Sequence, residues 1–324
     1  MIPSGHEVAR EEFVLAEAAD YTFTPTAGKV SATASDNGAT LTVACADAGV
    51  TLSFDARRGC LRQYTIAGRD VLAGELTPSF WRAPTDNDWG NNLHRRANAW
   101  RCAADNSVLL DFTCSTDANG CAVVKALYRL PDTSSALAVT YTIDGAGAVL
   151  VNVDWRADAD AAVPELPRFG VYLPLHRAFD HFTYYGRGPL ENYSDRCTAS
   201  FMGIYESTVA DQFYPYIRPQ ETGCKTAVRY ASLTDNGGCG LRVVGCKPLS
   251  VSALDVLPAD LDPGLSKHQM HNSDVRHSRD KVFLYVDMAQ RGLGGDDSWG
   301  RGPHAGHILD AKAYNYSFVI EPVK

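Results

Sequence analysis

Residues 137–155 read LAVTYTIDGAGAVLVNVDW, and this stretch decides the fold class. Apolar side chains occupy every second position on both sides of a central Asp-Gly, from Leu137 to Ile143 and from Val149 to Trp155. Alternation with a period of two buries one face of a strand, and a glycine favours the reversal between two strands. The stretch therefore predicts an antiparallel hairpin with one buried face.

The same period of two recurs along the chain, at residues 50–54 and 314–320, and after the turn at 234–238. Only residues 8–18, rich in Glu and Ala, read as a helix, and a strand over the same residues is an equally open interpretation. Many short strands and few helices predict an antiparallel sandwich or barrel. A (β/α)₈ barrel is excluded because it needs eight long helical segments.

The composition is that of an ordinary folded protein. The 324 residues are 45% hydrophobic and 21% charged, which excludes a disordered chain. The formal net charge is −8, so we expect no nucleic-acid partner, because such partners usually require a basic patch. No apolar run reaches the roughly 18 residues of a membrane span, so we expect no membrane insertion.

Cysteine usage and the first residues bear on the compartment. The nine cysteines include no CxxC pair, which predicts reduced, mostly buried thiols and no zinc site. The N-terminus carries charges where a signal peptide would be apolar. We expect a cytoplasmic protein by default, or a periplasmic one if a preceding segment carries an export signal.

Four segments have an unusual composition for loops. They read FWRAPTDNDWG (80–90), YGRGPLENYSDR (185–196), RPQETG (218–223) and GLGGDDSWG (292–300). Asp and Asn cap turns and Arg–Asp pairs clamp loops, so each segment alone indicates only a shaped turn. Trp299 differs, because a ring between glycine-rich turns offers a surface on which the apolar face of a sugar stacks.

The residues alone identify no reaction. A glycosidase needs two carboxylates, and no spacing in these loops singles out such a pair. No nucleophile elbow, zinc-protease, phosphate-loop or dinucleotide motif occurs. His268, His271 and His277 have spacings that suit a metal cluster, but a polar loop is the favoured interpretation, and we predict no metal site in this chain.

Taken together and in this order, the four segments resemble the C-terminal domain of the large bacterial β-galactosidases of glycoside hydrolase family 2. The resemblance covers about residues 28–324. Residues 1–18 resemble the last strand of the immunoglobulin-like domain that precedes it in those enzymes. We therefore expect two parts, the strand remnant at 1–18 and one β-sandwich domain at 19–324.

The resemblance implies an all-β fold, an antiparallel β-supersandwich like that of galactose mutarotases. It also implies that both catalytic Glu residues of this retaining enzyme lie in a (β/α)₈ barrel outside these 324 residues. This chain is then expected to be non-catalytic and inactive alone. Its expected partners are a galactoside such as lactose, the other domains of the enzyme, and possible further copies in a homo-oligomer. No cofactor is expected in this chain, and a divalent metal, Mg²⁺, only in the barrel.

The resemblance carries site roles onto individual residues. Trp299 is expected to reach into the active site of the barrel and stack on the sugar, and Gly90 and His94 belong to a loop that borders the same site. Supporting roles in shaping the loops are expected for Asp86, Asp88, Glu191, Asn192, Asp195, Arg196, Asp296 and Asp297.

Two other functions stay open. A stand-alone aldose 1-epimerase needs a general acid and a general base, which His176, His181, Glu191 and Glu221 offer by residue type. A carbohydrate-binding domain would differ from the accessory domain only in its affinity for sugar.

Overall fold

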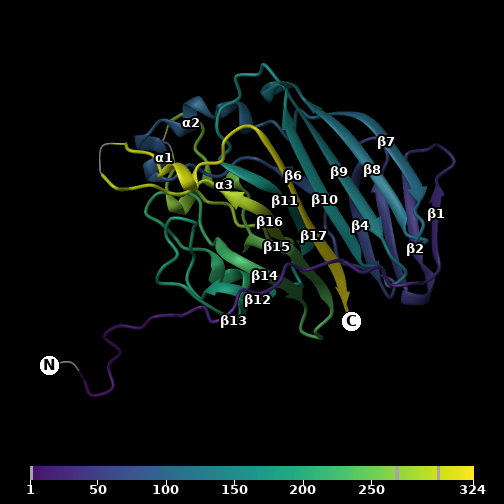
Figure 1. Cartoon of the computed structure of the whole chain (residues 1–324), viewed down its shortest axis with the longest axis horizontal. Coiled ribbons are helices and arrows are strands. Elements are labelled where there is room, and N and C mark those ends of the chain that lie inside the picture. Colours follow the sequence, from purple (N-terminus) through teal and green to yellow (C-terminus); the bar gives the residue numbers. More distant parts are fainter. Residues whose placement is uncertain (1–2, 267–269, 298–299) are drawn as a thin grey trace.

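Two antiparallel sheets form the molecule in the computed structural model, which describes residues 3–266, 270–297 and 300–324 (Figure 1). The smaller sheet has five strands in sequential order: β1 (Val30–Ala34), β2 (Thr40–Cys45), β3 (Val50–Asp55), β4 (Cys60–Ile66) and β5 (Arg69–Asp70). Each pairs with the next in the antiparallel sense. This sheet is therefore a meander of short connections.

The larger sheet takes most of the remaining chain. Its strands are β6 (Thr77–Ser79), β7 (Val108–Thr116), β8 (Ala122–Leu130), β9 (Ser135–Ile143), β10 (Val149–Ala157), β11 (Arg168–His176), β12 (His181–Gly188), β13 (Phe201–Thr208), β14 (Lys225–Thr234), β15 (Gly240–Leu254), β16 (Lys281–Gln290) and β17 (Ala313–Val323). The main path runs β13-β12-β14-β15-β17-β10-β9-β8-β7, and β6, β11 and β16 form a branch from β15.

Helices are few and short: α1 (Asp86–Gly90), α2 (Leu93–Arg96) and α3 (Pro258–Leu261). Within the described residues, no helix has the length and apolar character needed to cross a membrane. The expected all-β class with few helices is confirmed.

The hairpin predicted from residues 137–155 is present. β9 and β10 pair antiparallel from Ile143 opposite Val149 to Leu137 opposite Trp155. The side chains at the alternating apolar positions are buried, and β17 extends the sheet on the other side of β10. The other three stretches with a period of two also lie in strands, β3, β15 and β17.

The main core contains residues of both sheets, and the smaller sheet packs against β9 and its turn within it. Phe54 of β3 and Tyr141 of β9 meet edge to face with ring centroids 5.1 Å apart. The Tyr64 hydroxyl of β4 donates to the carbonyl of Gly147 in the β9–β10 turn. Contacts across both layers form one continuous buried cluster, which is the signature of a sandwich.

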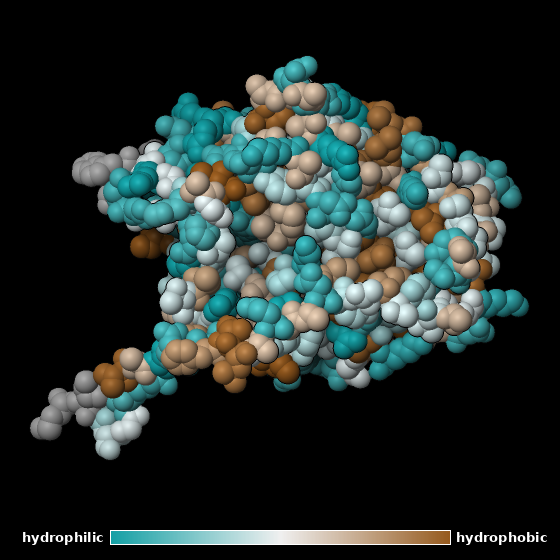
Figure 2. Space-filling model, in the orientation of Figure 1, coloured by the Kyte–Doolittle hydropathy of each residue, from teal (hydrophilic) through white to brown (hydrophobic). Residues whose placement is uncertain are grey.

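Residues 3–29 form neither the helix nor the strand that the sequence left open for residues 8–18. They run as an extended arm, and Figure 2 shows hydrophobic side chains along it. Glu12 accepts a hydrogen bond from the Met202 backbone at 2.7 Å, and Arg10 lies over the Phe201 ring at 4.5 Å. Phe13 and Leu15 are 80% and 97% exposed, so no apolar contact fixes this part of the arm. The assignment of residues 1–18 to another domain stays a prediction.

All nine cysteines are free thiols, but burial was predicted too broadly. Cys45, Cys60, Cys121 and Cys224 are buried, whereas Cys102 and Cys114 are exposed on the surface and three others are partly exposed. Burial raises the pKa of the Cys45 thiol to about 11, so this side chain acts as a small neutral core residue.

Asp144 holds the β9–β10 turn from inside the protein. It is 1% exposed, and its carboxylate accepts hydrogen bonds at 2.9 Å from the backbone of Ala146, Ala148 and Thr26. We expect Asp144→Ala to lower the free energy of unfolding by about 3 kcal/mol, because buried N–H groups lose their acceptor. Urea unfolding measures this difference.

Asp117→Ala is the matched control. Asp117 caps the β7–β8 turn through Asn119 and Cys121 in the same way, but it is partly exposed, so water replaces the lost acceptor. We expect a loss of about 1 kcal/mol there. Equal losses in the two variants would show that the Asp144 turn gains nothing from its burial.

Candidate functional site

Five strand ends, those of β6, β11, β12, β14 and β16, meet at one edge of the larger sheet. β11 is antiparallel to both β6 and β16, so the end of β6, the start of β11 and the end of β16 lie together. Lys225 at the start of β14 pairs with Val251 of β15, which also pairs with Val286 of β16. The segments that leave the sheet at this edge are therefore 80–90, 189–196, 218–223 and 291–297.

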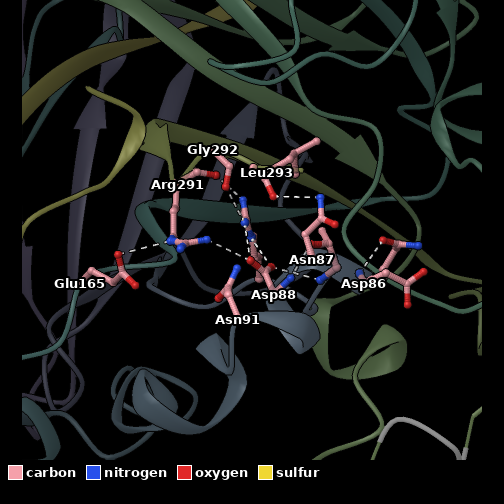
Figure 3. A network of polar contacts seen from close by, with 12 residues as sticks. Asp86, Asn87, Asp88, Asn91, Glu165, Arg291, Gly292 and Leu293 are labelled. Atoms are coloured by element: carbon pink, nitrogen blue, oxygen red, sulfur yellow. Dashed lines mark hydrogen bonds and ion pairs between the residues drawn. The ribbon is translucent and has the colours of Figure 1, made fainter. Parts of the chain in front are cut away.

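Asp88 is the centre of a buried ion network at this edge (Figure 3). Arg82 forms two hydrogen bonds to its carboxylate, at 2.9 and 3.0 Å, and Arg291 forms another at 3.2 Å. The three side chains are at most 1% exposed. Arg291 also lies 3.3 Å from Glu165, so each charge has a partner of opposite sign. Such pairing is required because an unpaired buried charge is very costly.

The same carboxylate shapes the backbone. Asp88 accepts a hydrogen bond from the Thr85 N–H at 3.0 Å, and the Thr85 hydroxyl accepts one from the Asp88 N–H at 3.2 Å. This reciprocal capping box starts α1. Asp88 thus shapes the backbone of its loop, and the supporting role that the sequence predicted for it in a sugar site stays a prediction.

Two of the motif loops, 80–90 and 185–196, hold the 291–297 segment. Arg82 donates to the carbonyl of Gly292 at 3.0 Å, and Asn87 donates to that of Leu293 at 3.2 Å. Asp195 accepts from the N–H groups of Leu293 and Gly294 at 2.9 and 2.8 Å. The backbone donors and acceptors of this segment are thus bound by side chains far away in the sequence.

α1 and the end of the 292–300 loop meet backbone to backbone. A Cβ built on Gly300 would lie 2.5 Å from the carbonyl oxygen of Gly90, closer than real contacts allow. Gly300 also has a φ of 96°, which only glycine adopts without strain. The two loops to which the resemblance gives sugar contacts are therefore neighbours.

Glu191 joins two of the motif loops. Its carboxylate accepts hydrogen bonds from Arg196 at 2.6 Å, from Thr222 at 3.0 Å, from the Gly223 N–H at 2.8 Å and from the Tyr216 hydroxyl. Burial alone would raise the pKa of Glu191, but these hydrogen bonds, that of Tyr216 foremost, hold it below its ordinary value. Glu191 is an anion whose oxygens are engaged in holding loops.

Asn192 is fully buried and also joins separate segments through hydrogen bonds, but with a neutral side chain. Its side-chain NH₂ donates to the carbonyls of Arg187 and Leu190 at 3.0 Å. Its side-chain oxygen accepts from the N–H of Thr226 at 2.9 Å. Asn192 thereby ties the 185–196 segment to β14.

A polar cleft of about 110 Å³ lies where the four loops converge. It is lined by Thr85, Asp86, Asn87, Glu191, Tyr193, Arg196, Tyr216, Gln220, Glu221 and Leu293. Within the described residues, no group of three or more His, Cys, Asp or Glu side chains is arranged to hold a metal ion. We define this cleft as the candidate site.

The predicted sugar contacts have different positions. Trp299 lies outside the described residues. Gly90 is exposed at the end of α1, whereas His94 is only 3% exposed and its ring packs on Trp89 with centroids 4.0 Å apart. Burial lowers the pKa of His94, so it is a neutral ring at physiological pH. The sugar contacts of these residues stay predictions.

The predicted supporting residues of the last loop bind within it. Asp296 lies 2.6 Å from His304, and Asp297 accepts from the Arg301 N–H at 3.2 Å. Asp86 pairs with Arg218 at 2.7 Å across two of the motif loops. These contacts stabilise loop shape, and the supporting role of these residues in a sugar site stays a prediction.

Sequence reasoning missed a second buried network below the cleft. Arg168 lies between Glu221 at 2.8 Å and Asp287 at 3.0 Å, and Gln290 donates to Glu221 at 3.1 Å. Burial raises the pKa of Asp287 to about 7, although Arg168 opposes the shift. The only signals in the sequence were an arginine at the start of a strand, Arg168, and an aspartate within an apolar strand, Asp287. Neither signal indicates which residue is the partner.

The residues considered for an epimerase do not form one site. Glu221 binds Arg168 at the start of β11, and His176 ends the same strand. Strands rise about 3.3 Å per residue, so His176 lies roughly 26 Å from Arg168. His181 is exposed and bound to Asn236. An acid–base pair drawn from both ends of β11 does not reach one sugar ring.

Comparison with known proteins identifies relatives of the same kind as the motifs suggest. The family described as β-galactosidase small chain matches residues 46–320. A β-galactosidase from Priestia megaterium is 33% identical over 321 residues, covering 99% of this chain and 30% of that protein. A β-galactosidase from Lactobacillus delbrueckii subsp. bulgaricus is 35% identical, covering 79% of this chain and 25% of that protein. The chain thus spans less than a third of the length of these curated relatives.

Among solved structures, galactose 1-epimerase from Lactobacillus acidophilus is similar in fold. Its TM-score is 0.51 at 13% sequence identity, covering 91% of this chain and 99% of the epimerase. At this identity the likeness concerns the fold alone. The expected mutarotase-like β-sandwich is confirmed.

The Asp88 network predicts a large stability difference between neighbouring carboxylates. Asp88→Asn should lower the free energy of unfolding by about 3–5 kcal/mol, because Arg82 and Arg291 then lose their buried counter-charge. Asp86→Asn is the control, two residues away. Its ion pair is exposed, so we expect a change of less than about 1 kcal/mol in urea unfolding. Similar values for both variants would contradict the role given to Asp88.

Asp287 predicts a pH dependence of stability. Its pKa rises from 3.8 to about 7 on folding, so the stability it contributes is present below about pH 4 and is lost as the pH rises to 7. Across this window, the free energy of unfolding of Asp287→Asn relative to wild type should therefore rise by roughly 1.4 kcal/mol per pH unit. Urea unfolding at pH 5, 6, 7 and 8 tests this, and a constant difference from pH 5 to 7 would refute it.

Proposed function

The chain belongs to the β-galactosidase small-chain family, and from this premise we propose that it is the non-catalytic part of a retaining glycoside hydrolase family 2 β-galactosidase. In this proposal the chain completes the sugar site of a separate barrel domain that carries both catalytic Glu residues. The substrate is a terminal β-D-galactoside of the lactose type.

The convergence of the four motif loops on one cleft carries this proposal. Loops distant in sequence are bound to each other by side chains such as Asp88 and Asp195. The loop that contains Trp299 is one of them. A surface built with this many long-range contacts suits a part that must present a fixed shape to a ligand or to another domain.

The chemistry of the cleft supports a non-catalytic role. A retaining glycosidase needs two available carboxyl groups about 5–5.5 Å apart, one as nucleophile and one as acid and base. Glu191 is held by four donors, and Glu221 is paired with Arg168 below the cleft. Carboxylates bound in this way hold the loops and are poor proton carriers. The two reacting groups, and any Mg²⁺, then belong to the barrel.

The length of the chain points to partners. The relatives are more than three times longer than the part that this chain matches. We infer that the remaining domains of the enzyme dock beside the cleft and that the assembled enzyme forms an oligomer. Trp299 then stacks on the sugar at the aglycone side, with Gly90 and His94 in the bordering loop.

Hydrolysis of nitrophenyl β-galactoside tests this function. The purified chain should show no turnover. A chimera in which it replaces the matching 30% of the Priestia megaterium enzyme should be active, and Trp299→Ala in that chimera should lower kcat/KM by roughly tenfold or more, because a stacking ring contributes about 1–2 kcal/mol.

Leu110→Ala in the chimera is the control, because Leu110 is 59% exposed on β7, far along the sheet from the cleft. It should leave kcat/KM unchanged. Turnover by the chain alone that is abolished by one carboxylate substitution would refute the non-catalytic role. A folded chimera that is insensitive to Trp299→Ala would remove that residue from the site.

A further inference from the structure

A second and larger hollow lies beside the cleft. Its volume is about 650 Å³, within the range of small-ligand sites. It lies between the 189–200 segment and residues 211–216, next to the strands β12, β13 and β14 (Figure 1), and Lys225 is also among its lining residues. Glu191, Arg196 and Tyr216 line both hollows, so these three side chains are the wall between them.

One side of the hollow is apolar and aromatic. Leu190 and Tyr214 are 71% and 59% exposed, and the Tyr214 ring lies against that of Tyr216 with centroids 4.6 Å apart. An exposed ring beside a cavity is a surface for the C–H face of a sugar ring. These side chains have no covering element within the described residues.

The charged groups of the hollow already have partners. Glu191 binds Arg196, and Asp195 accepts from Leu293 and Gly294. Asp211 accepts from the N–H and hydroxyl of Thr208. Because these carboxylates are engaged in the loops, the hollow offers no concentrated charge of either sign, and an ion gains little there. A neutral ligand with many hydroxyl groups fits better.

Lys225 is the exception. Its side chain is 3% exposed, and its ammonium donates to the Gly223 carbonyl at 3.3 Å. No carboxylate among the described residues lies within ion-pair distance of it. Burial lowers the pKa of Lys225 to about 8, so the group is mostly charged at neutral pH with N–H donors to spare. Lys225 lines the hollow, and a ligand hydroxyl there can accept one of its remaining N–H donors.

We propose that this hollow is a second saccharide subsite, in which a galactose unit stacks on Tyr214 and hydrogen-bonds to Lys225. The inference rests on the proposed function for the choice of a galactoside, but not for the presence of a sugar site. The wall of Glu191, Arg196 and Tyr216 separates this subsite from the cleft. It therefore takes a second sugar unit or a second molecule, and not the sugar that reaches the barrel.

Calorimetric titration of the purified full chain with lactose tests the proposal. We expect saturable binding with Kd in the millimolar range, because one ring and a few hydrogen bonds supply about 4 kcal/mol. Lys225→Met keeps the side-chain volume and removes the donors, and it should weaken binding roughly fivefold or more. Tyr214→Ala should weaken binding by a similar factor, and circular dichroism confirms that each variant is folded.

Lys281→Met is the matched control, because Lys281 also opens a strand but does not line the hollow. It should leave the affinity unchanged. The proposal is overturned if lactose does not bind at up to about 100 mM, or if folded Lys225→Met and Tyr214→Ala bind like wild type. Loss of binding in Asn87→Ala alone would also overturn it, since the sugar would then lie in the cleft. Hydrolysis by the chimera reports separately on the proposed function, so the two failures are distinguishable.

Discussion

The carboxylate of Asp88 is shared by two guanidinium groups that water does not reach, and the shape of the site depends on this arrangement. Burying three charges is unfavourable unless each finds its partner with good geometry. That requirement constrains how the 80–90 and 291–297 segments are positioned relative to each other. Because Arg82 also donates to backbone carbonyls of the second segment, correct pairing of charges and correct path of the chain are formed together.

The antiparallel sheet converts this local requirement into a site. Strands that alternate in direction deliver every second connection to the same edge, so segments separated by more than 200 residues become neighbours. Side chains with several donors or acceptors, among them Glu191 and Asn192, then fasten the connections to each other. The loops determine the shape of the cleft, and the sheet holds the ends of the loops in fixed positions. The hollow that Lys225 lines is formed at the same edge.

Local patterns were sufficient for the fold class and for the position of several strands. The alternation in residues 137–155 predicted both strands and the turn of the hairpin, because burial on one face leaves its mark in neighbouring residues. The motifs singled out the four loops that line the cleft. What they did not predict is pairing over distance. Arg168 and Asp287 are 119 positions apart, and nothing in either neighbourhood names the other. The burial of His94 was not predicted either, although Trp89, which covers its ring, is only five positions away.

The contact between Gly90 and Gly300 is not symmetric. A methyl group on Gly90 would lie 3.5 Å from Gly300, an ordinary contact, whereas one on Gly300 would collide with a carbonyl oxygen at 2.5 Å. The two glycines at this contact thus differ in whether they tolerate a larger side chain. Position 90 can accept alanine, while position 300 is fixed as strictly as a reacting group although it has no chemistry of its own. A saturation mutagenesis map would show that position 300 tolerates no substitution. Without the structure, that intolerance would be misread as a sign of a catalytic residue.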